Sequence, residues 1–206
     1  AVTVTNVNEA PLITSAAAAS VTENQTAATT VTSSDVDGGA PVYSIAGGAD
    51  AALFSIDSAT GVLTFNAAPN FEAPGDAGAN NVYDVTVQVA DGSGGFDTQA
   101  IAVTVTNVNE APVITNAATA NAAENQTTVT TVTSTDVDGG SAVYSIVGGA
   151  DAALFSIDSA TGVLTFTRAP TFEAPTDAGG NNVYDVTVQV ADGNGGSDTQ
   201  TITVTM

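Results

Sequence analysis

Acidic side chains recur at a fixed spacing along this 206-residue chain, with almost no opposite charge beside them. The sequence has 22 Asp and Glu residues against one Lys or Arg and no His, which gives a net charge of −21. Glu9 recurs as Glu110 and Glu23 recurs as Glu124, each 101 positions later. Carboxylates bind hard divalent cations, and they also act as general acids and bases. The acidic pattern is therefore compatible with two kinds of chemistry, cation binding and carboxylate catalysis.

Catalysis is the weaker of the two. Because the chain has neither His nor Cys, it cannot form the usual Ser-His or Cys-His nucleophile arrangements. A carboxylate pair can hydrolyse glycosides, but one acid then needs a raised pKa in a substrate cleft. The acids here fall on predicted turns. We therefore expect a protein that is not an enzyme.

The charge also excludes classes of partner. Nucleic acids and anionic membrane surfaces are bound by clustered Lys and Arg, and the only cationic side chain is Arg168. No apolar run reaches the length of about 18 residues that membrane insertion needs. At 43% hydrophobic residues the chain can bury a core. A compact protein this acidic repels itself, and bound divalent cations would neutralise it if the carboxylates cluster.

The repeat has the size of a whole domain rather than of a solenoid unit. Asp37, Glu72 and Asp91 also return 101 positions later, as Asp138, Glu173 and Asp192. The opening "AVTVTNVN" recurs at 102–109. We therefore predict that residues 1–8 are the last strand and linker of a preceding repeat. Residues 9–107 form the first repeat and residues 108–206 the second.

Within each repeat the apolar residues alternate with polar ones. Tyr83, Val85, Val87 and Val89 are separated by polar residues, which indicates a half-buried strand. Gly-containing and Asp-containing turns such as "DVDGG", "DSATG" and "DGSGG" separate the strands. No segment shows a sustained helical stripe, and "SAAAAS" at 15–20 is too short to predict a helix. The fold class predicted is all-β, with two tandem Greek-key β-sandwiches of seven strands each.

Several polar residues have a simple structural interpretation. The strand tyrosines, Tyr43, Tyr83, Tyr144 and Tyr184, are expected in the core with their hydroxyls near the surface. Asp57 is expected to close a hairpin turn. Asp50 and Asp84 are expected on solvated faces. Asp76, Asn80 and Asn81 lie in a loop for which a private calcium site is the alternative to a plain connection.

Seven motifs, in a fixed order, resemble the cadherin repeat in its bacterial cadherin-like form. They are "TEN" at 22–24, "YSI" at 43–45, "FSIDSATGVLTF" at 54–65, "NFE" at 70–72, "VQVADG" at 87–92, "VTNVNEAP" at 105–112 and "DVD" at 136–138. The resemblance covers essentially all of both repeats. It implies that Ca²⁺ lies between successive repeats.

The resemblance also implies which residues hold the ions. The first repeat supplies Glu23 and Glu72, the linker supplies Asn109 and Glu110, and the second repeat supplies Asp136, Asp138 and Asp192. Half-sites are expected at the outer ends, with Asn8, Glu9, Asp35, Asp37 and Asp91 at one end and Glu124 and Glu173 at the other. Neighbouring repeats of the same chain would complete them.

The match departs from the family pattern on the side of the first repeat. Asn107 and Asn70 stand where the family has Asp, and the loop "APGDAGANN" follows Glu72. These changes remove negative charge, so we expect two Ca²⁺ ions at the joint, with three as the alternative. The Asn109–Asp136–Asp138–Asp192 side is the best preserved.

Two functions remain. In the first, the repeats are non-catalytic spacers of a large extracellular or cell-surface adhesin, and Ca²⁺ at each joint stiffens the array. In the alternative, the repeats themselves mediate adhesion, through homophilic contacts or polysaccharide binding. The chain has no Trp, and a sugar platform usually needs exposed aromatic side chains. The carbohydrate version is therefore the weaker one.

Overall fold

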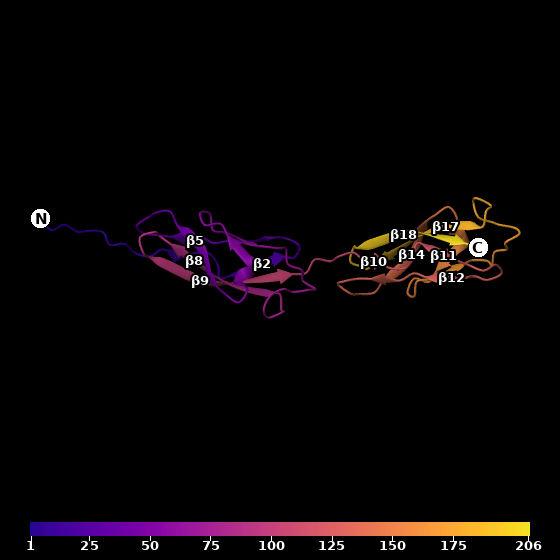
Figure 1. The fold of residues 1–206 in the computed structure, drawn as a ribbon, viewed down its shortest axis with the longest axis horizontal. Helices are drawn as coiled ribbons and strands as arrows, with labels where there is room; N and C mark the ends of the chain where they lie inside the picture. The colour runs from indigo at the N-terminus through magenta and orange to yellow at the C-terminus, as the bar shows by residue number, and fades with distance from the viewer. The chain divides into compact units, whose positions relative to one another are not determined.

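The computed structural model describes all 206 residues, and the chain divides into two compact units, residues 1–108 and 109–206 (Figure 1). Each unit is built from strands, with one three-residue 3-10 helix. No helix is both long and apolar enough to cross a membrane. Residues 1–8 form no strand, and their assignment to a preceding repeat stays a prediction.

Unit 1 contains two main sheets and one short pair. The four-stranded sheet has the order β2-β9-β8-β5, the three-stranded sheet has the order β3-β7-β6, and β1 pairs with β4. The elements are β1 (Leu12–Ile13), β2 (Ala18–Thr22), β3 (Ala27–Thr30), β4 (Ser33–Ser34), β5 (Val42–Gly47), η1 (Ala51–Leu53), β6 (Phe54–Ile56), β7 (Val62–Phe65), β8 (Val82–Ala90) and β9 (Phe96–Thr106).

Unit 2 repeats this topology with the sheets β11-β18-β17-β14 and β12-β16-β15 and the pair β10-β13. Its elements are β10 (Val113–Ile114), β11 (Thr119–Asn121), β12 (Thr128–Thr131), β13 (Ser134–Thr135), β14 (Val143–Gly148), η2 (Ala152–Leu154), β15 (Phe155–Ile157), β16 (Val163–Phe166), β17 (Val183–Ala191) and β18 (Ser197–Thr205).

The core of each unit comes from the alternating residues of its two longest strands. In unit 1, Val85, Val87 and Val89 on β8 are at most 1% exposed. Since side chains on a strand point to opposite faces in turn, the residues between them face solvent. Tyr83 packs edge-on against Phe65, with ring centroids 5.1 Å apart. This alternation is why a chain with few aromatic residues can still close a sandwich.

Nine strand segments per unit correspond to the seven strands that the sequence predicts. The first strand is split between β1 and β2, and the second between β3 and β4. β2 belongs to the four-stranded sheet and β3 to the three-stranded sheet, whereas β1 and β4 pair with each other. β1 runs antiparallel to β4, whereas β2 runs parallel to β9. The predicted all-β class of two tandem sandwiches is confirmed.

The turn at 57–61 shows how local chemistry fixes a hairpin. The carboxylate of Asp57 accepts the backbone N–H groups of Ala59 and Thr60 at 3.0 and 2.8 Å. Gly61 follows with φ +71°, and a Cβ there would lie 2.2 Å from the carbonyl oxygen of Val31. Only glycine fits this position. The predicted turn role of Asp57 is confirmed.

The tyrosine prediction is right about the core and only partly right about the hydroxyls. All four strand tyrosines are at most 8% exposed. The Tyr43 hydroxyl hydrogen-bonds to Ser33, and the Tyr83 hydroxyl accepts the N–H of Gly75. The Tyr184 hydroxyl is buried and has no hydrogen-bond partner. It does not reach the surface because the whole ring is covered.

Candidate metal centres

The acidic residues predicted for the start of unit 2 come together in three dimensions. Asp138 accepts the backbone N–H of Glu110 at 2.6 Å, and its own N–H donates to Asp136 at 3.0 Å. Asn109 donates its side-chain amide to Asp192 at 2.7 Å. The five residues therefore form one connected polar group.

The same group exists at the start of unit 1. Asp37 accepts the backbone N–H of Glu9 at 2.7 Å and donates its own N–H to Asp35 at 2.8 Å. Asn8 donates its side-chain amide to Asp91 at 2.7 Å. The local folding of each unit alone is therefore enough to gather these oxygens. Sequence reasoning missed one member, Asn6, whose amide donates to Asp37 at 2.6 Å.

Short turns fix the orientation of the aspartate side chains in this group. Asp192 directly follows β17, and one of its oxygens accepts the N–H groups of Asn194 and Gly196 at 2.6 and 3.0 Å. Gly193, with φ +81°, provides the left-handed residue that this tight turn requires. The carboxylate is thus held at the end of the sheet rather than free to rotate.

Neighbouring polar and charged groups shift the pKa values of several of these carboxylates. The pKa of Asp192 is lowered, first by the hydrogen bond from Asn109, and the pKa of Asp91 is lowered by its bond from Asn8. The pKa of Glu9 is raised, first by a hydrogen bond to the Asp37 carboxylate and then by the negative charge of Asp37. Crowded like charges of this kind favour uptake of a cation.

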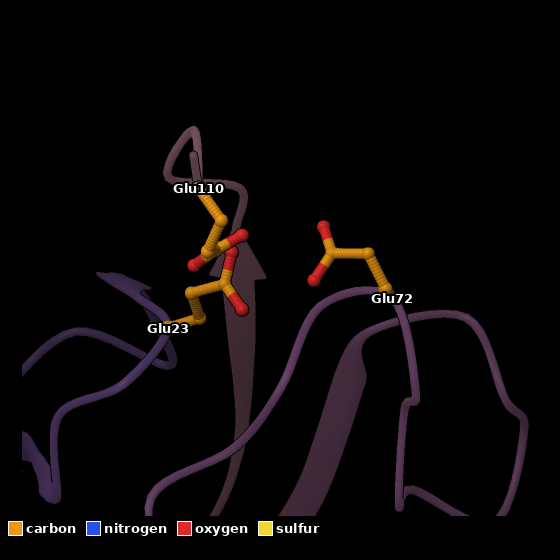
Figure 2. A group of neighbouring side chains, drawn as sticks. All are labelled: Glu23, Glu72 and Glu110. Carbon is orange, nitrogen blue, oxygen red and sulfur yellow. The ribbon is translucent and has the colours of Figure 1, made fainter. Parts of the chain in front are cut away.

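A second acidic group lies where the chain leaves unit 1. One ligand oxygen from each of Glu23, Glu72 and Glu110 lies within 4.8 Å of the other two. Figure 2 shows Glu23 and Glu110 with adjacent carboxylates and Glu72 turned toward them from a separate loop. Two oxygens that share one Ca²⁺, each about 2.4 Å from the ion, are at most about 4.8 Å apart. The three carboxylates fit that requirement.

Strand pairing puts Glu23 at this end of unit 1. Since β2 runs parallel to β9 with Thr22 opposite Thr106, the residues that follow both strands emerge together. The two oxygens of Glu23 accept the backbone N–H groups of Val108 and Phe71 at 2.9 and 2.8 Å. The side chain is only 1% exposed. Glu23 therefore ties the segment leaving β9 to the loop that carries Glu72.

The predicted half-site at the far end of unit 2 is less complete. Glu124 and Glu173 are both exposed. Glu124 accepts one backbone N–H, from Phe172, at 3.2 Å. These two residues are not part of any group of three acidic ligands in the structure. Their role as ligands stays a prediction.

Two buried aspartates explain the shape of the loop after Glu72: Asp76 lies in the loop, and Asp50, which directly precedes η1, lies outside it. Asp76 accepts the N–H groups of Asn80 and Asn81, both at 3.0 Å. Asp50 accepts those of Ala77 and Asp84 at 2.7 and 2.8 Å. Asp50 is only 4% exposed, so its predicted place on a solvated face is wrong. A buried carboxylate needs such donors.

The filled hydrogen bonds of this loop bear on the alternative of a private calcium site. Every oxygen of Asp50 and Asp76 already accepts a backbone N–H. Burial raises the pKa of Asp76, but the bonds from Asn80 and Asn81 outweigh it and leave the pKa lowered. These donors balance the negative charge of Asp50 and Asp76, and neither residue belongs to a group of three acidic ligands as Glu23 does, so a plain structural loop is favoured.

The loop is tied to the Glu23–Glu72 group by one asparagine. Asn81, at φ +62°, donates its side-chain amide to the carbonyl oxygen of Phe71 at 2.8 Å. Phe71 in turn donates its N–H to Glu23. Unit 2 repeats the arrangement with Asn182 and Phe172. We call residues 73–81 the brace, because they hold the backbone from which Glu72 projects. The paired "NN" at 80–81 was the only signal in the sequence.

Comparison with known families gives each unit a match to a different family model. The cadherin domain model matches residues 116–206, and the bacterial Ig domain model matches residues 8–104. No curated protein matches the chain. The family matches therefore describe the units one at a time.

Solved structures with the same fold are cadherin repeats. Human protocadherin-24 EC1-2 superposes with a TM-score of 0.64 at 18% identity, covering 96% of this chain and 98% of that one. Mouse cadherin-23 EC22-24 gives a TM-score of 0.59 at 19% identity, covering 96% of this chain and 67% of that one. Together with the strand order, these likenesses show that the chain has the fold of two tandem cadherin-like β-sandwich domains.

Proposed function

We propose that these repeats are calcium-binding spacers of a larger extracellular protein and that Ca²⁺ at the joint between repeats stiffens the array. The observation that carries the proposal is the gathering of Glu23, Glu72 and Glu110 oxygens within 4.8 Å of one another. With one Lys or Arg in the whole chain, the protein has almost no positive charge of its own to neutralise them.

Electrostatics makes a bare cluster costly. Two carboxylates about 4 Å apart repel by about 4 kcal/mol at an effective dielectric constant of about 20. Ca²⁺ takes six to eight oxygen ligands, and carboxylates and carbonyl oxygens are what it prefers. The oxygens of both acidic groups are of this kind. A divalent cation bound between the carboxylates would thus replace their mutual repulsion with attraction to a shared ion.

The ligands we propose for the joint come from three segments. They are Glu23 and Glu72, then Asn109 and Glu110, then Asp136, Asp138 and Asp192. Asn109 presents its amide nitrogen to Asp192, so ligation would require its side-chain oxygen instead. We propose two ions, with three as the alternative. The outer groups at Asn8–Asp91 and Glu124–Glu173 would be completed by neighbouring repeats.

The proposed location follows from the affinity such sites have. Extracellular calcium modules bind in the range of about 10⁻⁴ to 10⁻³ M. Ions would fill them outside the cell and leave them empty in a cytosol. We therefore place the protein outside the cell or at its surface, and assign it no catalytic role.

The test is thermal unfolding of the chain in excess Ca²⁺ and in chelator, with small-angle scattering under both conditions. We expect Ca²⁺ to raise the Tm and to make the particle longer and stiffer. The double variant E72Q/E110Q should lose most of both responses. Asp84→Asn is the matched control, because Asp84 is exposed and lies outside both acidic groups. Equal responses in all three proteins would refute the calcium-pinned joint.

Direct adhesion is the second candidate, and one surface feature favours it. On unit 1, Val42 pairs with Ala90, which pairs with Phe96, so the three form a row across one sheet. Val42 and Phe96 are 50% and 58% exposed. A similar structure, protocadherin gammaB7 EC3-6, is described as a cis-dimer. Sedimentation of Phe96→Ser beside the native chain tests this: a concentration-dependent dimer lost in the variant would support it.

A further inference from the structure

The chain contains a single Asn-Gly pair, Asn194–Gly195, in the turn between β17 and β18. Unit 1 has Ser93–Gly94 at the equivalent place. In every other case the residue after an asparagine carries a side chain. Unit 2 therefore differs from unit 1 by one chemically reactive peptide bond, set two residues after Asp192.

We propose that Asn194 is a site of spontaneous deamidation that alters the Asp192 turn of unit 2. The backbone nitrogen of Gly195 loses its proton and bonds to Cγ of Asn194, and the side-chain nitrogen leaves as ammonia. Water then opens the resulting succinimide. Cleavage at Cγ gives aspartate, and cleavage at the main-chain carbonyl carbon gives isoaspartate. Water is the only co-reactant, and nothing is oxidised or reduced.

Both residues of the pair are open to water, and the Gly195 N–H that must lose its proton points to the Asp192 carboxylate. Asn194 and Gly195 are both exposed, so water reaches either carbonyl carbon. Nothing lies within 4 Å of the position where a Cβ on Gly195 would stand. The absence of that Cβ is what lets the glycine nitrogen approach Cγ of the preceding asparagine. An asparagine followed by Val, Ala, Glu, Gln, Phe or another Asn, as in the rest of this chain, lacks this freedom.

The product would disturb the candidate metal centre. The N–H groups of Asn194 and Gly196 both point at Asp192, at 2.6 and 3.0 Å. In isoaspartate the main chain runs through the former side chain and is one carbon longer. That extra carbon falls between the two N–H groups, so both cannot keep their bonds to one carboxylate. Asp192 then loses part of the turn that aims it.

The proposal does not depend on the calcium function, because deamidation is read from mass alone. The full chain is incubated at neutral pH in calcium-free buffer, and its asparagines are followed by peptide mapping with fragmentation. We expect Asn194 to convert faster than every other asparagine, including the exposed Asn24 and Asn125. Conversion of Asn194 no faster than these two would overturn the assignment.

Two variants use unit 1 as the control. Asn194→Ser places the residue of unit 1 in unit 2 and should abolish the fast conversion. Ser93→Asn should create a second fast site in unit 1, since only the backbone N–H of Ser93 contacts Asp91. A Ser93→Asn chain without new conversion would show that the Asn-Gly pair in this turn is not sufficient.

The structural consequence has its own readout. The aged native chain should unfold at a lower Tm than an Asn194→Ser chain aged for the same time, and the loss should follow the isoaspartate content. An unchanged Tm at high isoaspartate content would overturn the claim that the product disturbs the Asp192 turn.

Discussion

Glu23 shows how one residue serves both the fold and the candidate site. Its two oxygens accept two backbone N–H groups while the side chain is 1% exposed. Glu23→Gln replaces one acceptor oxygen with an amide that faces an N–H donor. We expect unit 1 to lose about 1–3 kcal/mol of unfolding free energy even without calcium. Denaturant unfolding in chelator measures this loss.

The second repeat provides the control for that substitution. Glu124 is exposed and accepts only the N–H of Phe172 at 3.2 Å. Glu124→Gln should therefore change the unfolding free energy by no more than about 0.5 kcal/mol. Equal losses from the two variants would mean that burial of Glu23 does not matter.

Asp76 predicts a pH dependence whose sign follows from its lowered pKa. An unfolded Asp has a pKa of about 3.9. Because the unfolded state then binds more protons than the folded state, the stabilisation is full above about pH 4. It is lost as the pH falls through the lower folded pKa. The difference in unfolding free energy between native and Asp76→Asn chains should be larger at pH 7 than near pH 3. A difference that stays constant with pH would contradict this.

Prediction at the residue scale succeeded where a side chain bonds to residues close to it in the sequence. It failed where the partners of the side chain lie far away in the sequence. Asp57 could be placed because its partners lie two and three residues ahead. Asp50 could not, since its partners Ala77 and Asp84 are 27 and 34 residues away. Nothing in "GGAD" reveals that a loop will fold over it.

At the level of elements, the brace is the feature that most needs a test. Asn81 combines a left-handed backbone with an amide bond to Phe71. Asn81→Gly keeps the backbone free of strain and removes only the side chain. We expect unit 1 to lose about 1 kcal/mol of unfolding free energy, and Ca²⁺ to bind more weakly because Glu72 is less well held. Calorimetric titration and denaturant unfolding measure the two effects.

Added backbone freedom must be separated from the lost amide. Ala79 lies in the same loop with φ +49°, so Ala79→Gly adds the same freedom without removing a hydrogen bond. It should leave both Ca²⁺ affinity and stability nearly unchanged. If Ala79→Gly weakens calcium as much as Asn81→Gly does, loop flexibility rather than the Phe71 contact is responsible.

Element prediction worked best for long alternating strands. β8 alternates along its whole length and β9 alternates from Ile101 to Val105. The two strands pair along most of their lengths, so their register follows from which face is apolar. Two-residue segments such as β1 and β4 have no pattern to read. The brace was also not predictable in shape, because it is organised by buried aspartates rather than by turn residues alone.

At the scale of the whole molecule, the two units have separate hydrophobic cores, one in residues 13–105 and one in residues 114–204. What they share is charge: the chain carries −21 with almost nothing to offset it. A charge of that size destabilises the compact state through self-repulsion. Any salt relieves repulsion between exposed groups, because the Debye length shrinks to about 10 Å at 0.1 M. Stabilisation by calcium therefore has to exceed what ionic strength alone provides.

The deciding comparison is Tm in CaCl₂, MgCl₂ and NaCl at matched ionic strength. Screening depends on ionic strength and acts on all carboxylates, so it should raise the Tm gradually with every salt. Site binding depends on ligand geometry. Ca²⁺ accepts flexible shells of six to eight oxygens, whereas Mg²⁺ demands a near-octahedral shell and keeps its waters. We expect millimolar Ca²⁺ to raise the Tm well above the Mg²⁺ and Na⁺ curves, and E72Q/E110Q to fall back onto them. If the three salts coincide for the native chain, the carboxylates respond only as a diffuse charge, and the acidic ends of the repeats are solvated surface rather than joints.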